Sequence, residues 1–143
     1  MLVATILQTK GRTVHTVGPD ETTAAVVAKL SELNIGALVV SSTGRTVEGI
    51  ISERDIVRGL AEKGAKLLEE PVSKLMTADV RTCAPQDTSR GVLAMMTEGR
   101  IRHLPVIDKG ELCGLISIGD AVKSRLDEIT SEAHALREYI AQT

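Results

Sequence analysis

Two short stretches of the chain place a serine and an aspartate at the same spacing. "GIISERDIV" occupies residues 49–57 and "GLISIGDAV" occupies residues 114–122, so that Ser52 and Asp55 recur as Ser117 and Asp120. A serine followed three residues later by an acidic residue resembles the capping box that begins many helices. A helix start also offers free N–H groups to a phosphate, and an ionised carboxylate accepts hydrogen bonds from adjacent hydroxyls. The spacing alone favours the capping interpretation, and the two interpretations are compatible.

The residues around the two motifs differ. Between serine and aspartate the first copy has Glu53 and Arg54, and the second has Ile118 and Gly119. The planar guanidinium group of Arg54 is suited to a phosphate. Ahead of its preceding strand the second copy carries cations where the first has uncharged residues, namely Arg100, Arg102 and His103. Such cations are either solvated or ligand-binding, so the sequence predicts two related positions that are not equivalent.

The sequence offers little for catalysis. "GLISIG" at 114–119 reads G-x-x-S-x-G rather than the G-x-S-x-G of a nucleophile elbow. The chain has no G-x-x-x-x-G-K-[ST] phosphate loop. His15, His103 and His134 show no metal-ligand spacing. We therefore expect no catalytic residue, no enzyme activity and no bound metal.

The motifs lie within a longer internal repeat. Residues 14–40 align with residues 80–106 at ten identical positions, among them Val26/Val92 and Leu38/Leu104. Each copy predicts a short β-rich stretch (13–17 and 80–83), an amphipathic helix, an apolar strand, a turn with a further strand (47–51 and 112–116), and a second helix. The order β-α-β-β-α therefore occurs twice.

The two copies end differently. The last helix of the first copy is expected to stop near Gly64, a favourable residue just after a helix. The last helix of the second copy is expected to continue to the C-terminus. Its apolar residues are spaced 4-3-4-3-4, at Val122, Leu126, Ile129, Ala133, Leu136 and Ile140. This stripe either packs on the chain's own core or forms a dimer seam.

These elements predict an α/β (α+β) fold. A unit of about 60 residues buries only about 60% of its unfolded surface and is marginal alone. We therefore expect the two copies to pack sheet to sheet as one module with pseudo-two-fold symmetry, followed by a C-terminal helix.

Composition excludes several classes of function. The net charge of −2 gives no pull toward nucleic acid or an anionic membrane. Phe and Trp are absent and Tyr139 is the one aromatic residue, so stacking on single-stranded nucleic acid is disfavoured. The apolar runs are too short to span a bilayer, and the N-terminus lacks a signal-peptide pattern. We expect a cytoplasmic protein that binds neither nucleic acid nor membrane.

The duplicated pattern resembles the cystathionine-β-synthase (CBS) domain pair, or Bateman module. The fit is close over "RHLPVIDKGELCGLISIGDAV" (102–122) and good over "IGALVVSSTGRTVEGIISERDIV" (35–57), where Val39 stands at a position that is often proline in the family. The first repeat has Gln8-Thr9 where the second has the Met-Thr pair of "LMTADV". The resemblance places one module over 1–143, with repeats at 6–66 and 67–130 and a helical extension at 131–143.

The resemblance implies a regulatory module that binds adenosine derivatives, such as AMP, ADP, ATP or NAD(H), in two clefts between the repeats. It also implies a flat homodimer and a regulated partner protein. Asp55 and Asp120 would bind ribose, and Ser52 and Ser117 would lie on the phosphate side. The other implied nucleotide-binding residues are Thr9, Val14, Ala37, Leu38, Ile51, Glu53, Arg54, Thr77, Val80, Arg102, His103, Pro105, Ile116, Ile118 and Gly119.

Two other functions compete with this one. The chain could be a dimeric scaffold in which the clefts are vestigial, or an enzyme such as a nucleotide hydrolase. No general base or metal cluster in the sequence supports an enzyme.

Overall fold

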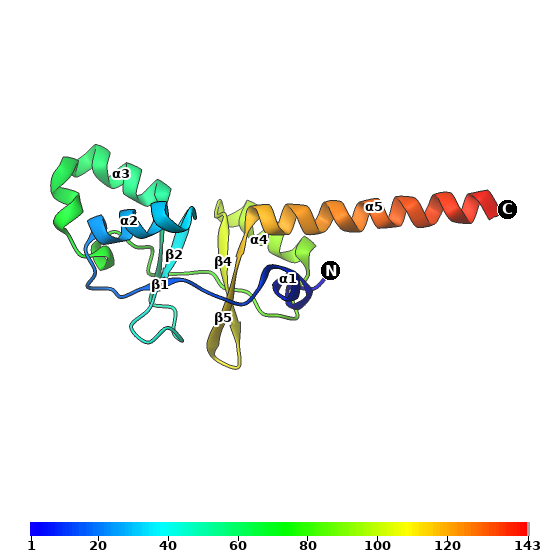
Figure 1. Ribbon diagram of the computed structural model, residues 1–143, viewed down its shortest axis with the longest axis horizontal. Coiled ribbons are helices and arrows are strands. Elements are labelled where there is room, and N and C mark those ends of the chain that lie inside the picture. The colour runs from blue at the N-terminus through cyan, green and yellow to red at the C-terminus, as the bar shows by residue number, and fades with distance from the viewer. Residues whose placement is uncertain (143) are drawn as a thin grey trace.

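The computed structural model describes residues 1–142. Its first half has the predicted β-α-β-β-α order, and its second half has the same order without the first strand (Figure 1). Thr143, the last residue of the predicted extension, lies outside the described residues. The first half consists of β1 (Thr16–Val17), α2 (Thr23–Leu33), β2 (Ala37–Val40), β3 (Gly49–Ser52) and α3 (Glu53–Lys63). The second consists of α4 (Ser89–Gly99), β4 (His103–Asp108), β5 (Glu111–Ser117) and α5 (Ile118–Gln142). An additional helix, α1 (Val3–Lys10), precedes them, and two 3-10 turns, η1 (Gly64–Glu69) and η2 (Val72–Lys74), connect them.

Two small sheets lie next to each other at the centre of the molecule (Figure 1). In the first sheet, β1 pairs in parallel with β2, and β2 pairs antiparallel with β3. The second sheet is the β4–β5 hairpin, with His103 opposite Ser117. Helices α2 and α3 lie beside the first sheet, and α4 and α5 lie beside the second. The predicted α/β fold class is confirmed.

The strand predicted at 80–83 does not form. Cys83 makes one parallel bridge to Val106, donating its N–H to the Pro105 carbonyl and accepting the Ile107 N–H. The next bond of a parallel ladder would need an N–H from residue 105, and proline has none. In the first repeat Val39 stands at the equivalent position, and β1 pairs there. A proline in β4 therefore shortens the second sheet by one strand.

The two hydrophobic cores take segments from each other's half of the chain. The first core contains β1, α2, β2 and β3 residues together with Val72 from the connecting segment. The second core contains Val92, Leu104 and Ile116, and it also takes up Val3, Ile6 and Leu7 of α1. The sequence did not predict α1. Because α1 is the first helix of the chain yet packs on the second half, it ties the two halves together.

A glycine permits the close approach of one of these segments in each repeat. A Cβ atom at Gly49 would lie 2.4 Å from the Met76 sulfur and 3.0 Å from the Thr77 carbonyl oxygen. A Cβ atom at Gly114 would lie 2.7 Å from Leu7 Cδ2. The recurring glycine of the nonapeptide is thus a packing requirement, met by the connecting segment in one repeat and by α1 in the other.

Helix α5 runs on beyond the rest of the molecule (Figure 1). Its first turns bury Ala121 and Ser124, whereas every described residue from 129 to 142 is exposed. The predicted apolar stripe is exposed as well, with Leu126 at 58% and Leu136 at 59%. The stripe therefore does not pack on the chain's own core. Among the described helices, none has both the length and the apolar character needed to cross a membrane.

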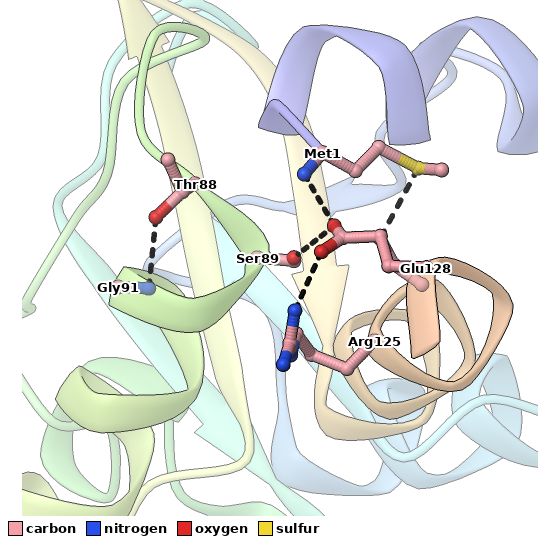
Figure 2. A network of polar contacts seen from close by, with 7 residues as sticks. Met1, Thr88, Ser89, Gly91, Arg125 and Glu128 are labelled. Atoms are coloured by element: carbon pink, nitrogen blue, oxygen red, sulfur yellow. Dashed lines mark hydrogen bonds and ion pairs between the residues drawn. The ribbon is translucent and has the colours of Figure 1, made fainter. Parts of the chain in front are cut away.

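A carboxylate on α5 joins three segments (Figure 2). Glu128 accepts hydrogen bonds from the amino group of Met1, from the Ser89 hydroxyl at 2.8 Å and from the Arg125 guanidinium at 2.6 Å. The bond from the N-terminal amino group, followed by the bonds from Ser89 and Arg125, lowers the pKa of Glu128 to about 2. The ionised carboxylate therefore holds the N-terminus and the start of α4 against α5.

Gly114→Ala is expected to destabilise the fold by about 1–3 kcal/mol, the usual cost of overpacking a core. Leu7 is 1% exposed, so it has little room to move away from an added methyl group. Gly18→Ala is the matched control, because its nearest neighbour would lie 3.8 Å away. Urea unfolding measures both. An alanine at 114 as stable as the parent would contradict the proposed packing role.

Glu128→Gln is expected to lower the melting temperature at pH 7 by more than it does at pH 2.5. The folded pKa is depressed, so the stabilisation is fully present above the ordinary value of 4.5 and is lost as the pH falls toward about 2. Asp127→Asn, at an exposed position on the same helix, serves as the control. A Glu128→Gln difference that does not change with pH would contradict this prediction.

Candidate functional site

The serine and aspartate of the first motif form a capping box at the start of α3. The Ser52 hydroxyl oxygen accepts the N–H of Asp55 at 3.3 Å. Asp55 Oδ2 accepts the Ser52 N–H at 2.9 Å and the Ser52 hydroxyl at 3.0 Å. The capping interpretation is therefore confirmed. These bonds also fix the Asp55 carboxylate beside the N-terminus of α3, where a partial positive charge favours an anion.

The second motif has the same bonds and an additional cation. Asp120 Oδ2 accepts the Ser117 N–H at 2.9 Å, the Ser117 hydroxyl at 2.8 Å and Lys10 Nζ at 2.5 Å. Burial alone would raise the pKa of Asp120, but the bonds from Lys10 and Ser117 outweigh it and keep the pKa below its ordinary value. The second carboxylate is thus held as an anion by a cation of the same chain.

A cavity of about 820 Å³ lies between the two repeats. One wall is the start of α3, with Ser52, Arg54 and Asp55, and the other is the 99–103 segment that leads into β4. The connecting segment contributes Thr77 and Val80. Five arginines line the cavity, namely Arg54, Arg58, Arg81, Arg100 and Arg102.

The charge around this cavity is predominantly positive. Three acidic residues, Glu53, Asp55 and Asp79, line it together with the five arginines. Within residues 1–142, none of these five guanidinium groups forms an ion pair or a side-chain hydrogen bond. Unpaired arginines that surround a concave site favour an anionic ligand, since they offer paired N–H donors to phosphate or carboxylate.

A second, smaller cavity of about 300 Å³ lies against β5. Lys10, Thr13, Val14 and His15 line one part of it. The remaining lining residues are Asn34, Ile35, Gly36, Ala37, His103, Leu115 and Ser117. Of the described residues that line it, none is acidic. Lys10 lines this cavity, whereas Asp120, the carboxylate to which it is bonded, does not.

His103 lies between the two cavities and lines both. Burial lowers the pKa of His103, and Lys10 lowers it further, while Asp120 and Glu53 act in the opposite direction. The imidazole is therefore neutral at pH 7, and each of its two nitrogens is either a donor or an acceptor.

Two segments of the chain, residues 9–62 and 72–127, match the family described as CBS domain. The chain belongs to the CBS-domain family. This confirms the resemblance drawn from the duplicated motifs, and the two matches show that the chain is a tandem CBS pair.

Known relatives agree with this assignment. The mitochondrial CBS domain-containing protein CBSX3 of Arabidopsis thaliana is 34% identical over 125 residues, which cover 85% of this chain and 61% of that protein. The chain thus spans less than two thirds of that relative's length. A CBS-domain-containing protein from Agrobacterium tumefaciens is 44% identical in its crystal structure, with a TM-score of 0.84, covering 87% of this chain and 99% of that one. A CBS domain protein from Pyrobaculum aerophilum, solved in complex with AMP, is 25% identical with a TM-score of 0.75, covering 84% of this chain and 89% of that one.

The CBS pair brings most of the candidate residues of its first motif to one cavity. The larger cavity is lined by Ser52, Glu53, Arg54, Asp55, Thr77, Val80, Arg102 and His103. The smaller cavity is lined by Val14, Ala37, Ser117 and again His103.

The remaining candidate residues lie elsewhere. The side chains of Leu38, Ile51 and Ile116 are fully buried and belong to the two hydrophobic cores. Pro105 is buried in β4, and Thr9 is exposed on α1. Ile118 and Gly119 are exposed in the first turn of α5, and the Asp120 carboxylate is bonded to the Lys10 ammonium group. Among the described residues that line the cavities, none of these eight appears.

Sequence reasoning missed several residues of the larger cavity. The motif analysis did not single out Arg58, although its position four residues after Arg54 places both on one face of α3. Arg81 and Asp79 flank Val80, which the resemblance had implied. Lys10 had no signal, because the helix that carries it was not predicted.

Proposed function

We propose that this CBS pair is a non-catalytic regulatory module that senses an adenosine nucleotide in the larger cavity. One observation carries the proposal: the cavity joins the N-terminus of α3 and the fixed carboxylate of Asp55 to five unpaired arginines. Its volume of about 820 Å³ lies within the range of small-molecule sites, about 300–1,000 Å³. The related Pyrobaculum aerophilum protein, which binds AMP, supports an adenosine ligand.

Each part of a nucleotide has a matching group in this cavity. The Asp55 carboxylate is an acceptor for the two hydroxyls of a ribose. The Ser52 hydroxyl and the partial positive charge at the N-terminus of α3 suit a phosphate, and Arg54 lies in the same turn. Ile50, Val80 and Ile101 provide apolar surface for the base.

The arginines favour a ligand with more than one phosphate. The arginines lie on both walls of the cavity, and ADP, ATP and NAD(H) carry more phosphate charge for them to bind than AMP does. We accordingly rank these above AMP for the larger cavity. The regulated protein is unidentified, and the expected cytoplasmic location stays a prediction.

The scaffold alternative does not account for the arginines. Like charges gathered in a cavity without partners repel one another, which destabilises the fold. Such unfavourable arrangements are typical of functional sites. A thermal-shift screen with AMP, ADP, ATP and NAD(H) separates the two functions. A ligand at 100 times its Kd stabilises the fold by about 2.7 kcal/mol, whereas a vestigial cleft gives no shift.

Asp55→Ala is expected to weaken ATP binding by roughly ten- to a hundredfold. Hydrogen bonds to a charged group contribute about 1.5–3 kcal/mol, and each 1.4 kcal/mol is tenfold in affinity. The lost cap costs about 1 kcal/mol of stability, so isothermal titration should be run where the variant is folded. Asp127→Ala, at an exposed position on α5, is the control. If Asp55→Ala binds ATP like the parent, the aspartate is a cap and nothing more.

Arg54→Ala should weaken the binding of ATP more than that of adenosine, because its contact is with phosphate charge. Titration of both ligands against this variant tests the point. An equal loss for ATP and adenosine would place Arg54 away from the phosphates.

We further propose that the protein is a homodimer held by the exposed stripe of α5. The projecting part of α5 exposes Ile129 and Leu136 to solvent. Because isolated helices of fewer than about 12–15 residues are marginal in water, we expect this segment to pack against a partner. With Leu126 at heptad position a, Glu132 falls at g and Arg137 at the following e. A parallel coiled coil pairs these two positions between chains.

Replacing both Ile129 and Leu136 with Glu is expected to convert the dimer to a monomer in sedimentation equilibrium, because four charges would face one another in the seam. Ala135→Glu, off the stripe, should leave the dimer intact. A monomeric parent would refute the dimer, and a dimeric double variant would place its interface elsewhere.

A further inference from the structure

We propose that Lys10 occupies the ribose position of the second cleft, so that the chain binds one nucleotide, in the larger cavity only. This inference rests on the proposed function, since it takes Asp55 as the ribose-binding residue of the first cleft. It identifies Lys10 as the residue that makes the two duplicated sites unequal.

The two carboxylates have the same internal bonds but different neighbours. Asp55 Oδ2 is bonded to the N–H and the hydroxyl of Ser52. Asp120 Oδ2 has these two bonds from Ser117 and, in addition, the ammonium group of Lys10 at 2.5 Å. An ammonium group has three donors and no acceptor. It can satisfy Asp120 as ribose hydroxyls would, but it has no acceptor to take the place of the carboxylate for those hydroxyls.

A second bond of Lys10 shows what it replaces. Its Nζ also donates to the carbonyl oxygen of Leu115, at 2.7 Å. The equivalent carbonyl in the first repeat, that of Ile50, accepts the backbone N–H of Thr77 at 2.9 Å. In the first cleft a backbone N–H bonds to this carbonyl, and the Asp55 carboxylate remains able to accept hydrogen bonds from a ligand. In the second cleft, the Lys10 side chain bonds to both the carbonyl and the carboxylate.

Lys10 is held in this position by the fold. It is the last residue of α1, and Val3, Ile6 and Leu7 anchor that helix in the second core. A cation at the C-terminus of a helix is also favoured by the helix dipole. Because the backbone of α1 is fixed, Lys10 cannot leave this position by a movement of the helix. A ligand could displace only its side chain.

The cavities agree with this assignment. Asp55 lines the larger one, whereas Lys10 rather than Asp120 lines the smaller one. The smaller cavity, about 300 Å³, is at the lower limit of small-molecule sites. The Lys10 side chain is 36% exposed and that of Asp120 is 23% exposed, so the ion pair is partly open to solvent.

The test is the stoichiometry of ATP and AMP binding to the full chain by isothermal titration. The parent should bind one nucleotide, and Asp55→Ala should weaken that binding by roughly ten- to a hundredfold, so that it no longer counts as a tight site. Lys10→Met, which keeps the length of the side chain, should bind two, and Lys10→Met with Asp55→Ala should again bind one. Addition of Asp120→Ala to that double variant should remove this last site. Lys66→Met, at an exposed position on η1, is the control.

The outcomes separate this inference from the proposed function. A parent that binds two nucleotides with similar affinity, or a folded Lys10→Met that still binds one, overturns the role of Lys10 and leaves the first cleft standing. If the parent binds none, the proposed function fails. In that case Lys10→Met supports the inference by binding one nucleotide at Asp120 and overturns it by binding none. Lys10→Ala repeats the test if the methionine variant is poorly folded.

Discussion

The close approach of a chain segment to Gly49 and to Gly114 is the contact on which the two clefts depend. At each glycine the hairpin strand must accept a neighbour that would collide with any Cβ atom. Met76 and Thr77 fill the space at Gly49, and Leu7 fills it at Gly114. The glycine lies three residues before the motif serine, so the segment that packs on it also passes the start of the following helix. That segment therefore decides what faces the carboxylate.

The segment that packs on the glycine has a different secondary structure in each repeat. An irregular segment at Gly49 pairs through its backbone, since Thr77 and Ile50 exchange two hydrogen bonds. A helix at Gly114 has its own N–H groups in use, because an α-helix bonds them internally. The free carbonyl of Leu115 is then satisfied by a side chain, and the last residue of the helix, Lys10, supplies it. The inequality of the two sites thus follows from replacing a strand-like partner with a helical one.

Much of the fold could be predicted from the sequence because the repeat presents each pattern twice. The helix starts at Thr22 and Thr88, the strands of the two hairpins and the stop at Gly64 all follow local rules. Helix α1 could not be predicted in this way, since it has no counterpart in the other repeat and only three of its residues are buried. The missing strand at 80–83 had a local cause in Pro105, which becomes visible only once the parallel register is known.

The candidate site was predictable to the extent that it is built from the motif itself. Ser52 and Asp55 are fixed by bonds within four residues, so their geometry follows from the sequence. The arginines come from three separate segments, α3, the connecting segment and the turn before β4, and only the tertiary fold brings them together. A net charge of −2 for the whole chain gave no indication of such a cluster. Local charge at a cleft is set by topology and is independent of the overall balance.

The arrangement of those arginines bears on how a module of this kind can respond to a ligand. Arg54 and Arg58 belong to the first repeat, and Arg100 and Arg102 to the second. Any shift of one repeat relative to the other changes the distance between the two sets, so an anion that bridges them favours the arrangement in which both reach it. The Arg102 carbonyl accepts the N–H of Ile118, the first residue of α5, at 2.8 Å. The wall of the cleft and the start of the projecting helix are thus joined directly by a backbone hydrogen bond.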